Sequence, residues 1–209
     1  LAAICGGTTT VLDFATQIPG HDIRHALDEA AERWKGNGYT DYSYHPIFTN
    51  GTSDEAVNQI PELIQEGFAS FKIFTTSIRP PSPQMQNNKT EFGTLASIME
   101  KIAANGGMLL VHSEDDDMVH FNYDHAQERD QWDWWNMHHI HNNLSEDVSF
   151  HRVIRLAESS PAPSTSCTSA HQRASTPSHG PAAEAFQFTG RRFTTTPASM
   201  LRTIAKTTA

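Results

Sequence analysis

The stretch GFASFKIFTTS, residues 67–77, places a single lysine, Lys72, in the middle of an apolar run. A run of aromatic and apolar residues that follows a glycine predicts a buried strand, here over residues 69–76. Lysine is rarely found inside such a strand unless its ammonium group is paired, reaches solvent along its stem or is chemically altered. The environment of Lys72 therefore needs a chemical explanation.

Strands and helices alternate on both sides of this stretch. Apolar runs predict three more strands, over residues 8–15, 41–49 and 107–114. The helical spacing of apolar residues predicts four helices, over residues 22–34, 53–65, 90–105 and 144–158. A long insertion with no assigned element separates the last strand from the last helix. This alternation implies an α/β fold with parallel strands, either an open sheet or a partial (β/α)8 TIM-like barrel.

Parallel α/β folds gather their chemistry at the carboxyl ends of the strands. Lys72 and His112 are both expected late in their strands, so a functional interpretation is strongest for these two residues. The alternative is structural: Lys72 reaches solvent from a strand end, and His112 is a hydrogen-bonded core histidine.

Composition limits the class of protein. The 209 residues carry a net charge of −9, which argues against a nucleic-acid partner. No apolar run approaches the roughly 20 residues that a membrane span needs, so no membrane partner is expected. Cys5 and Cys167 lie too far apart in sequence to suggest a disulfide framework, and a reducing, cytoplasmic setting is expected. The chain does not begin with Met, and we expect further residues before Leu1.

The composition changes near residue 158. Residues 159–209 contain five basic residues and one acidic residue, a balance of +4, which leaves −13 for residues 1–158. This tail is rich in Ser and Thr and contains no Trp or Tyr. We therefore divide the chain into a partial barrel domain, 1–158, and a tail, 159–209, that is expected to be irregular.

Five segments resemble one family, the cyclic amidohydrolases dihydropyrimidinase and hydantoinase. They are AAICGGTTTVLDF (2–14), DYSYHPIFT (41–49), EGFASFKIF (66–74), GGMLLVHSED (106–115) and HNNLSEDVSFHRVIRLAE (141–158). The Ser-Phe-Lys and Val-His elements are the specific ones, and the Gly-Gly-Thr-Thr element is weak alone. The resemblance covers well under half of a full-length member and implies a TIM-barrel hydrolase of carbon–nitrogen bonds in cyclic amides.

The resemblance also implies a metal centre. In the family the lysine at the position of Lys72 is carbamylated and bridges two divalent metal ions, usually Zn²⁺, and the histidine at His112 binds the second metal. The metals lower the pKa of bound water. Other ligands are expected before residue 1 and after residue 158, so we assign no catalytic residue within this chain. Ser77 stands where the family usually has a substrate-contacting tyrosine, and it is a weak substrate-binding candidate. Intact relatives are commonly homotetramers.

The tail does not resemble the family as written, but a shifted reading of its codons does. When the third base of each codon is joined to the first two bases of the next, residues 164–169 permit Leu-Tyr-Ile-Met-His-Val. The family has Tyr-Ile-Met-His-Val here, and this histidine is its next metal ligand. Residues 173–178, 186–191 and 193–196 permit the family's following segments. We hypothesise a one-base frameshift or a wrong splice site near residues 159–163, with an out-of-frame, disordered tail.

Two further clusters have competing interpretations. His138, His139 and His141 have spacings that suit a metal site, or they belong to a loop that packs on Trp132, Trp134 and Trp135. The acidic run 114–117 suits a cation site, but a solvated loop at the strand end is the simpler interpretation, with Glu114 set apart by its position beside His112.

Two functions of different class remain open from the sequence. One is a metal-dependent hydrolase that opens a dihydropyrimidine or hydantoin ring. The other is non-catalytic, either a truncated pseudo-enzyme or a dihydropyrimidinase-related structural protein. Lys72 and His112 favour the first for the parent gene, and the missing ligands favour the second for this polypeptide.

Overall fold

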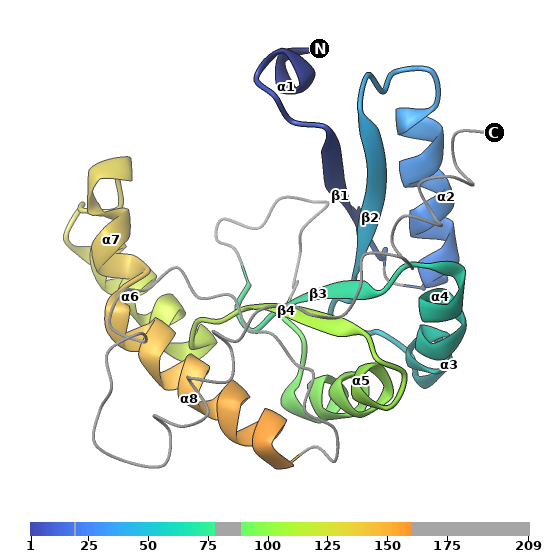
Figure 1. Ribbon diagram of the computed structural model, residues 1–209. Coiled ribbons are helices and arrows are strands. Elements are labelled where there is room, and N and C mark those ends of the chain that lie inside the picture. Colours follow the sequence, from blue (N-terminus) through green and yellow to red (C-terminus); the bar gives the residue numbers. More distant parts are fainter. Residues whose placement is uncertain (19, 78–88, 160–209) are drawn as a thin grey trace.

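A sheet of four parallel strands forms the centre of the computed structural model, which describes residues 1–18, 20–77 and 89–159 (Figure 1). The strands are β1 (Thr10–Thr16), β2 (Asp41–Ile47), β3 (Ser70–Phe74) and β4 (Met108–His112). Their order in the sheet is β1-β2-β3-β4, the same as in the chain. A doubly wound open sheet reverses its strand order, whereas a barrel keeps consecutive strands adjacent. The strand order therefore matches part of a (β/α)8 barrel, and the predicted strands are confirmed.

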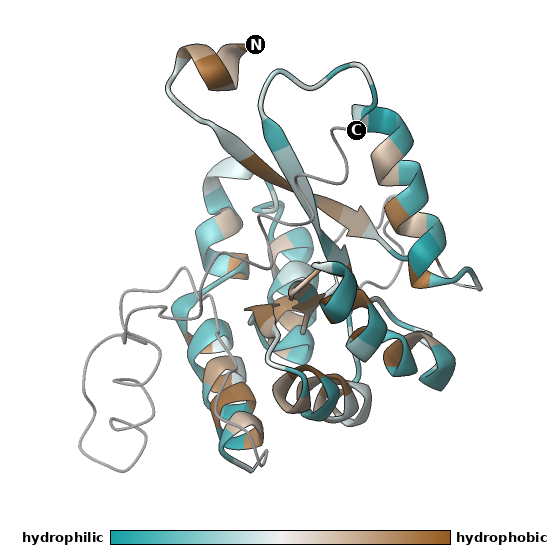
Figure 2. Cartoon of the chain, turned by 45° about the vertical axis from the view of Figure 1, so that its right-hand side comes forward, coloured by the Kyte–Doolittle hydropathy of each residue, from teal (hydrophilic) through white to brown (hydrophobic). Residues whose placement is uncertain are grey.

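Helices cover one face of this sheet. They are α2 (Ile23–Trp34), α3 (Asp54–Asn58), α4 (Ile60–Glu66), α5 (Phe92–Ala104) and α8 (Asn143–Ser159), and a short α1 (Ala2–Cys5) precedes β1. Their apolar sides meet alternate strand residues such as Ala15, Tyr44, Phe71, Ile73 and Val111 in one buried core. Figure 2 shows the same arrangement, with polar residues on the outer sides of the helices and apolar residues in β3 and β4.

Local signals in the sequence set the ends of these helices. The carboxylate of Asp22 accepts a hydrogen bond from the N–H of Arg24 at the start of α2, and the hydroxyl of Ser53 accepts one from Ala56 at the start of α3. Gly67 ends α4 with a φ of 109°, a left-handed conformation that favours glycine. The single helix predicted over 53–65 is divided at Gln59, because Pro61 in the first turn of α4 lacks the N–H that would continue α3.

Helix α8 begins one residue before the predicted start at residue 144. The side-chain oxygen of Asn142 accepts hydrogen bonds from the N–H groups of Leu144 and Ser145, at 3.1 and 3.0 Å. Ser145 lies one turn further in and is fully buried, with its hydroxyl donating to the carbonyl of Asn142. Asn142 is thus the N-cap of α8.

The insertion between β4 and α8 contains helices that the sequence analysis did not assign. They are α6 (Asp116–Glu128), the 3-10 turn η1 (Trp134–Asn136) and α7 (Met137–Ile140). They form a separate small core around Val119, Tyr123 and Ile140, beside α8 (Figure 1). The proposed packing of this loop on its tryptophans is wrong, because Trp134 and Trp135 are more than 80% exposed.

The acidic run 114–117 is not a solvated loop. Glu114 is buried, Asp115 caps α6 by accepting a hydrogen bond from the N–H of Met118, and the side chain of Asp116 is mostly buried. Only Asp117 is exposed. Three of the four acidic side chains are therefore committed to contacts at the end of β4 and the start of α6.

The second face of the sheet carries the site candidates. Register pairs place Phe14 beside His45, Ile47 beside Lys72, and Phe74 beside His112, and paired residues of parallel strands project to the same face. Phe14 and Leu12 are well exposed on this face. In a closed barrel this face is the interior, so it holds the residues that a barrel uses for packing and chemistry.

The tail prediction lies outside the described residues, since the structure describes nothing beyond Ser159. Within the described ranges, no helix is both long and apolar enough to span a membrane.

Candidate functional site

Lys72 is the third of the five residues of β3, rather than near the end of its strand as predicted. Its side chain is on the second face and only 9% of the residue is exposed. The ammonium nitrogen lies 4.9 Å from the centre of the Phe74 ring, a cation–π distance. The backbone around Lys72 is fixed by parallel pairing on both sides, since its carbonyl accepts the N–H of Phe48 and it pairs with Leu110. The strand thus holds a buried amine in one place.

His45 is a neighbour of Lys72 on the same face. Its Nδ1 atom lies 2.6 Å from the hydroxyl oxygen of Ser70, which is buried. Burial is the main cause that lowers the pKa of His45, opposed by a hydrogen bond with Ser70 and assisted by the positive charge of Lys72. The imidazole is therefore neutral at neutral pH and can sit beside the lysine without charge repulsion.

His112 is the last residue of β4, as predicted, and its side chain is 48% exposed. Its ring centre lies 5.4 Å from that of Phe74, so Phe74 contacts both Lys72 and His112. The Nε2 atom of His112 lies 2.7 Å from Oε2 of Glu114. The two predicted site residues are thus held on one face by a shared aromatic ring and a buried carboxylate.

Glu114 links β4 to the insertion. Its Oε1 atom lies 2.8 Å from Nδ1 of His141, and the Nε2 atom of His141 lies 3.3 Å from the hydroxyl of Tyr123. Burial alone would raise the pKa of Glu114, but the hydrogen bonds from His112 and His141 outweigh it and lower the pKa to about 2. The same hydrogen bond raises the pKa of His141. The carboxyl group is therefore ionised at neutral pH.

Ser77 follows β3 and is buried, with its N–H donating to Oδ1 of Asp116 at 2.8 Å. Asp116 also accepts a hydrogen bond from the Thr76 hydroxyl at 3.1 Å, and its Oδ2 lies 3.3 Å from the Lys89 ammonium. Burial would raise the pKa of Asp116, but the Ser77 N–H and the charges of His120 and Lys89 lower it. Asp116 therefore fixes the positions of Ser77 and Lys89, the described residues on either side of 78–88. The role of Ser77 in substrate binding stays a prediction.

The three histidines of the insertion do not form one site. His141 turns toward Glu114. The ring centres of His138 and His139 lie 3.8 Å apart with the planes tilted by 43°, and Nδ1 of His138 lies 2.9 Å from the carbonyl oxygen of Trp135. Across the described ranges, no three His, Cys, Asp or Glu side chains are grouped so that they could hold a metal ion. The separate metal site considered for these histidines is therefore not formed by the described residues.

Lys72 and His112 fit part of a metal centre. They lie on one face of the sheet, and both contact the ring of Phe74. A carbamate on Lys72 would offer hard oxygen ligands and His112 an imidazole nitrogen, a donor set that suits Zn²⁺. Two ligand residues alone do not complete a site for two metal ions.

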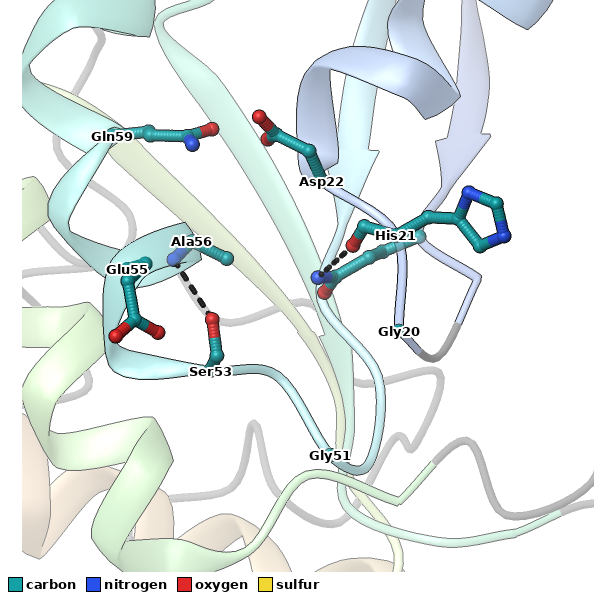
Figure 3. A pocket seen from close by; sticks show the side chains of 9 residues that line it. Gly20, His21, Asp22, Gly51, Ser53, Glu55, Ala56 and Gln59 are labelled. Carbon is teal, nitrogen blue, oxygen red and sulfur yellow. Dashed lines mark hydrogen bonds between the residues drawn. The ribbon is translucent and has the colours of Figure 1, made fainter.

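A cavity of about 290 Å³ lies at the same end of the sheet but on the helix side (Figure 3). The loops after β1 and β2 form it, and the side chains of Asp22 and Gln59 point toward each other across it. Gln17 also lines the cavity and donates a hydrogen bond from its side-chain amide to the carbonyl of His21. Neither Lys72 nor His112 lines this cavity, so it is distinct from the candidate metal centre.

The sequence analysis missed the connections of Glu114, Asp116 and His141. Glu114 did stand out in the sequence by its position two residues after His112, the last residue of β4, at the edge where barrel chemistry gathers, but its hydrogen bonds were not predicted. His141 is 27 residues from Glu114, and no local pattern indicates their contact.

Comparison with known proteins gives a consistent result. A D-hydantoinase of Streptomyces coelicolor is 32% identical over 162 residues, which cover 78% of this chain and 33% of that protein. A D-hydantoinase of Rhizobium radiobacter is 32% identical over 121 residues, 58% of this chain and 25% of that protein. No family model matches the sequence.

Solved structures agree with these relatives. A D-hydantoinase structure superposes with a TM-score of 0.71 at 28% identity, covering 79% of this chain and 34% of that one. The dihydropyrimidinase of Brevibacillus agri, at 19% identity, supports the fold, with a TM-score of 0.72 over 99% of this chain and 38% of that one. The matched part makes up between a quarter and two fifths of the length of these proteins. The chain is therefore homologous to part of a protein of the hydantoinase and dihydropyrimidinase family.

Proposed function

We propose that this chain derives from a metal-dependent hydrolase that opens cyclic amides, such as a dihydropyrimidine or hydantoin ring. The observation that carries the proposal is Lys72, a buried amine that lies on the same face of the sheet as His112, in a chain homologous to D-hydantoinases. Carbamylation would turn this amine into an oxygen ligand for a divalent metal ion.

The proposed centre uses Lys72 after carbamylation. The ammonium group first loses one proton, and the neutral amine then adds to CO₂, which forms a carbon–nitrogen bond and releases a second proton. A cation thereby becomes an anionic carbamate. The carbamate oxygens and His112 would then supply part of the ligand set for two divalent ions, with Zn²⁺ expected. Such ions polarise a carbonyl group and lower the pKa of water. Neutral His45 beside Lys72 leaves the amine without a second positive charge as a neighbour.

Ring opening consumes one water molecule. Its oxygen adds to the amide carbon, the ring carbon–nitrogen bond breaks, and the nitrogen takes up a proton. The substrate is therefore a small cyclic amide rather than a nucleic acid, in keeping with the net charge of −9. We expect a cytoplasmic setting and, for intact relatives, a homotetramer.

A non-catalytic role is the second candidate. It is favoured by the absence, among the described residues, of any group of three potential ligands. In that case the chain keeps the fold and the lysine without a working centre.

Metal content separates the two candidates. The full chain would be purified with Zn²⁺ and ¹³C-bicarbonate, then assayed for bound metal, for a carbamate ¹³C signal and for hydrolysis of dihydrouracil and hydantoin. The hydrolase proposal expects about two metal ions per chain and a carbamate signal that Lys72→Met abolishes. Lys35→Met, which removes an exposed lysine, is the matched control and should change neither. A chain that takes up neither metal nor carbamate would favour the non-catalytic role.

A further inference from the structure

We propose that Asn50 is a modification site, at which the side-chain amide is lost in an intramolecular reaction with the backbone nitrogen of Gly51. The product is an aspartate or an isoaspartate on the loop after β2. The proposal does not depend on the hydrolase function, because it involves neither Lys72 nor His112.

The sequence contains three Asn-Gly pairs, at residues 37–38, 50–51 and 105–106. Glycine has no Cβ, so the nitrogen that follows the asparagine is unhindered and the backbone around it can turn toward the asparagine side chain. All three pairs share this advantage. Any difference in their reactivity must therefore come from the fold.

The Asn50–Gly51 peptide group lies at the centre of a turn. The N–H of Thr52 donates to the carbonyl of Thr49 at 3.3 Å, which closes a β-turn. Gly51 has a φ of 78° and Asn50 is outside the left-handed region, the pattern of a type II turn. Gly51 is exposed, and nothing lies within 4 Å of the point where a Cβ would stand. Water therefore reaches this peptide group.

No hydrogen bond holds this peptide group in place. Within the described ranges, the side-chain amide and the carbonyl of Asn50 and the N–H of Gly51 have no hydrogen-bond partner. A peptide group between the two central residues of a turn can rotate while the closing bond between Thr49 and Thr52 persists. The Asn50 side-chain carbon can therefore approach the Gly51 nitrogen without the loss of a hydrogen bond.

The first of the other two pairs is held on both sides. Asn37 donates a hydrogen bond from its side-chain amide to the carbonyl of Arg33 at 3.0 Å. The N–H of Gly38 donates to the carbonyl of Trp34 at 3.2 Å. Both bonds run back to the last turn of α2, so they keep the side chain of Asn37 away from the nitrogen that follows it.

The third pair repeats this arrangement at the end of α5. Asn105 donates its side-chain amide to the carbonyl of Lys101 at 2.7 Å, and the N–H of Gly106 donates to the carbonyl of Ala103 at 3.4 Å. Reaction at either of these two pairs breaks two hydrogen bonds, whereas reaction at Asn50 breaks none. The fold thus selects one Asn-Gly pair out of three.

The reaction needs only water as a co-reactant. The Gly51 nitrogen forms a bond to the side-chain carbon of Asn50, the bond from that carbon to the amide nitrogen breaks, and the amide nitrogen leaves as ammonia with the proton of the Gly51 nitrogen. One water molecule then opens the resulting succinimide ring at either carbonyl. One opening gives aspartate, and the other gives isoaspartate, in which the main chain is one carbon longer.

The modified loop borders the cavity on the helix side of the sheet, because Gly51 and Ser53 line it (Figure 3). The hydroxyl of Thr52 donates to Oε1 of Gln17 at 2.8 Å and so joins the loop after β2 to the loop after β1. A new carboxylate and a longer main chain beside Thr52 should disturb this link. The isoaspartate carboxyl is in addition a substrate for methyl transfer by isoaspartate-specific carboxyl methyltransferases.

The test compares the three pairs within one molecule. The full chain would be kept folded in mildly alkaline buffer, digested at acidic pH and analysed by mass spectrometry with fragmentation that assigns the modified residue. We expect Asn50 to lose its amide several-fold faster than Asn37 or Asn105. Exposure alone predicts a different order, because Asn37 is exposed and Asn50 is half-buried. In urea the three rates should become similar, because the unfolded chain retains only the shared Asn-Gly sequence.

The isoaspartate content of the aged chain provides the second readout. It would be measured by transfer of a labelled methyl group from S-adenosylmethionine with a purified isoaspartate carboxyl methyltransferase. Asn50→Gln should remove most of the label, because the longer side chain does not form the five-membered ring readily. Asn37→Gln is the matched control and should keep the label.

Three outcomes would overturn the proposal. One is a folded chain in which Asn37 or Asn105 reacts as fast as Asn50, and another is a folded chain in which Asn50 keeps its amide. The third is the same preference for Asn50 in urea, which would assign the selection to the flanking sequence and not to the turn. None of these outcomes depends on a variant, since all are measured on the unaltered chain.

Discussion

Tyr44 carries a hydroxyl that is buried without a hydrogen-bond partner among the described residues. Burial, with the nearby Tyr42 and Asp13, raises the pKa of Tyr44 to about 12. An unpaired buried hydroxyl costs about 1–3 kcal/mol. We therefore predict that Tyr44→Phe raises the free energy of unfolding by roughly 1 kcal/mol in urea denaturation. Tyr39→Phe, at an exposed position, should leave stability unchanged. A clear loss of stability in Tyr44→Phe would mean that the hydroxyl has a partner, such as a buried water.

At the scale of single residues, the sequence identifies some members of the site and not others. Lys72 and His112 could be found because each violates its local pattern, a charge in an apolar run and a histidine at a strand end. Glu114 and His141 could not be paired, because their contact depends on how the insertion folds back over β4. Side chains that act through other residues leave a weaker trace in the sequence than those that break a hydrophobic pattern.

At the element scale, the helices that were predicted and the helix that was missed differ in their apolar faces. α2 buries Ile23, Ala26, Leu27 and Ala30 at helical spacing, so its periodicity is plain. α6 spans 13 residues but buries only Val119 and Tyr123, and its other positions are largely polar. A helix with so few core contacts carries little periodic signal, although Asp115 does provide a capping signal.

Asp116 at the start of α6 makes the stability of the described domain sensitive to acid. Its pKa is below the usual value in the folded chain, so its contribution is complete above the unfolded value near 3.8 and is lost as pH falls through the folded value. We predict that Asp116→Asn destabilises the chain by about 1.5–3 kcal/mol at neutral pH, the range for hydrogen bonds to a charged group. The difference from the unaltered chain should shrink at the acidic end of a pH series of urea denaturations.

Asp117→Asn tests whether the acid sensitivity of stability belongs to Asp116, because the Asp117 carboxylate is exposed and lies in the first turn of the same helix. If the free energy of unfolding loses its pH dependence equally in both variants, the assignment to Asp116 is contradicted. Such a result would point to a general effect of negative charge near the N-terminus of α6.

The cap of α8 gives a second prediction for an element. Asn142→Ala removes the oxygen that accepts the N–H groups of Leu144 and Ser145 and should cost about 1 kcal/mol in urea denaturation. Asn143→Ala, one residue later and inside the helix, should be neutral or slightly stabilising because alanine favours helix. Equal losses in both variants would show that Asn142 is not the cap.

For the whole molecule, the alternation of strands and helices was sufficient to predict parallel strands, but it could not choose between an open sheet and a barrel. The choice comes from the order β1-β2-β3-β4, which depends on which strands pair across long sequence separations. The alternation also does not show how far the domain extends beyond residue 158, because the hypothesis about the tail concerns the coding DNA rather than the fold.

Sequencing the coding DNA across residues 155–200 tests that hypothesis. We predict that the offset frame is open and reads Tyr-Ile-Met-His-Val over residues 164–169. This result would supply the next expected metal ligand in the corrected protein. Stop codons in the offset frame, or no histidine there, would make the tail genuine and strengthen the non-catalytic alternative.

The uncovered face of the sheet leads to the last prediction. In the described part of the chain, β1 and β4 each pair with a strand on one side only, and Phe14 on β1 is 46% exposed. Unpaired strand edges and contiguous apolar side chains favour association with other chains. We predict that the full chain self-associates in a concentration-dependent way, measured by sedimentation velocity, and that Phe14→Ser shifts it toward the monomer.

Phe121→Ser is the matched control, because Phe121 is similarly exposed but lies on α6, away from the sheet. If association proceeds through the open sheet, Phe14→Ser reduces it several-fold while Phe121→Ser leaves it unchanged. The reverse pattern would place the contact on the insertion, where Trp134 and Trp135 are also exposed. Because both substitutions remove one exposed ring, a difference between them reports where the ring stands in the fold and not how much apolar surface was removed.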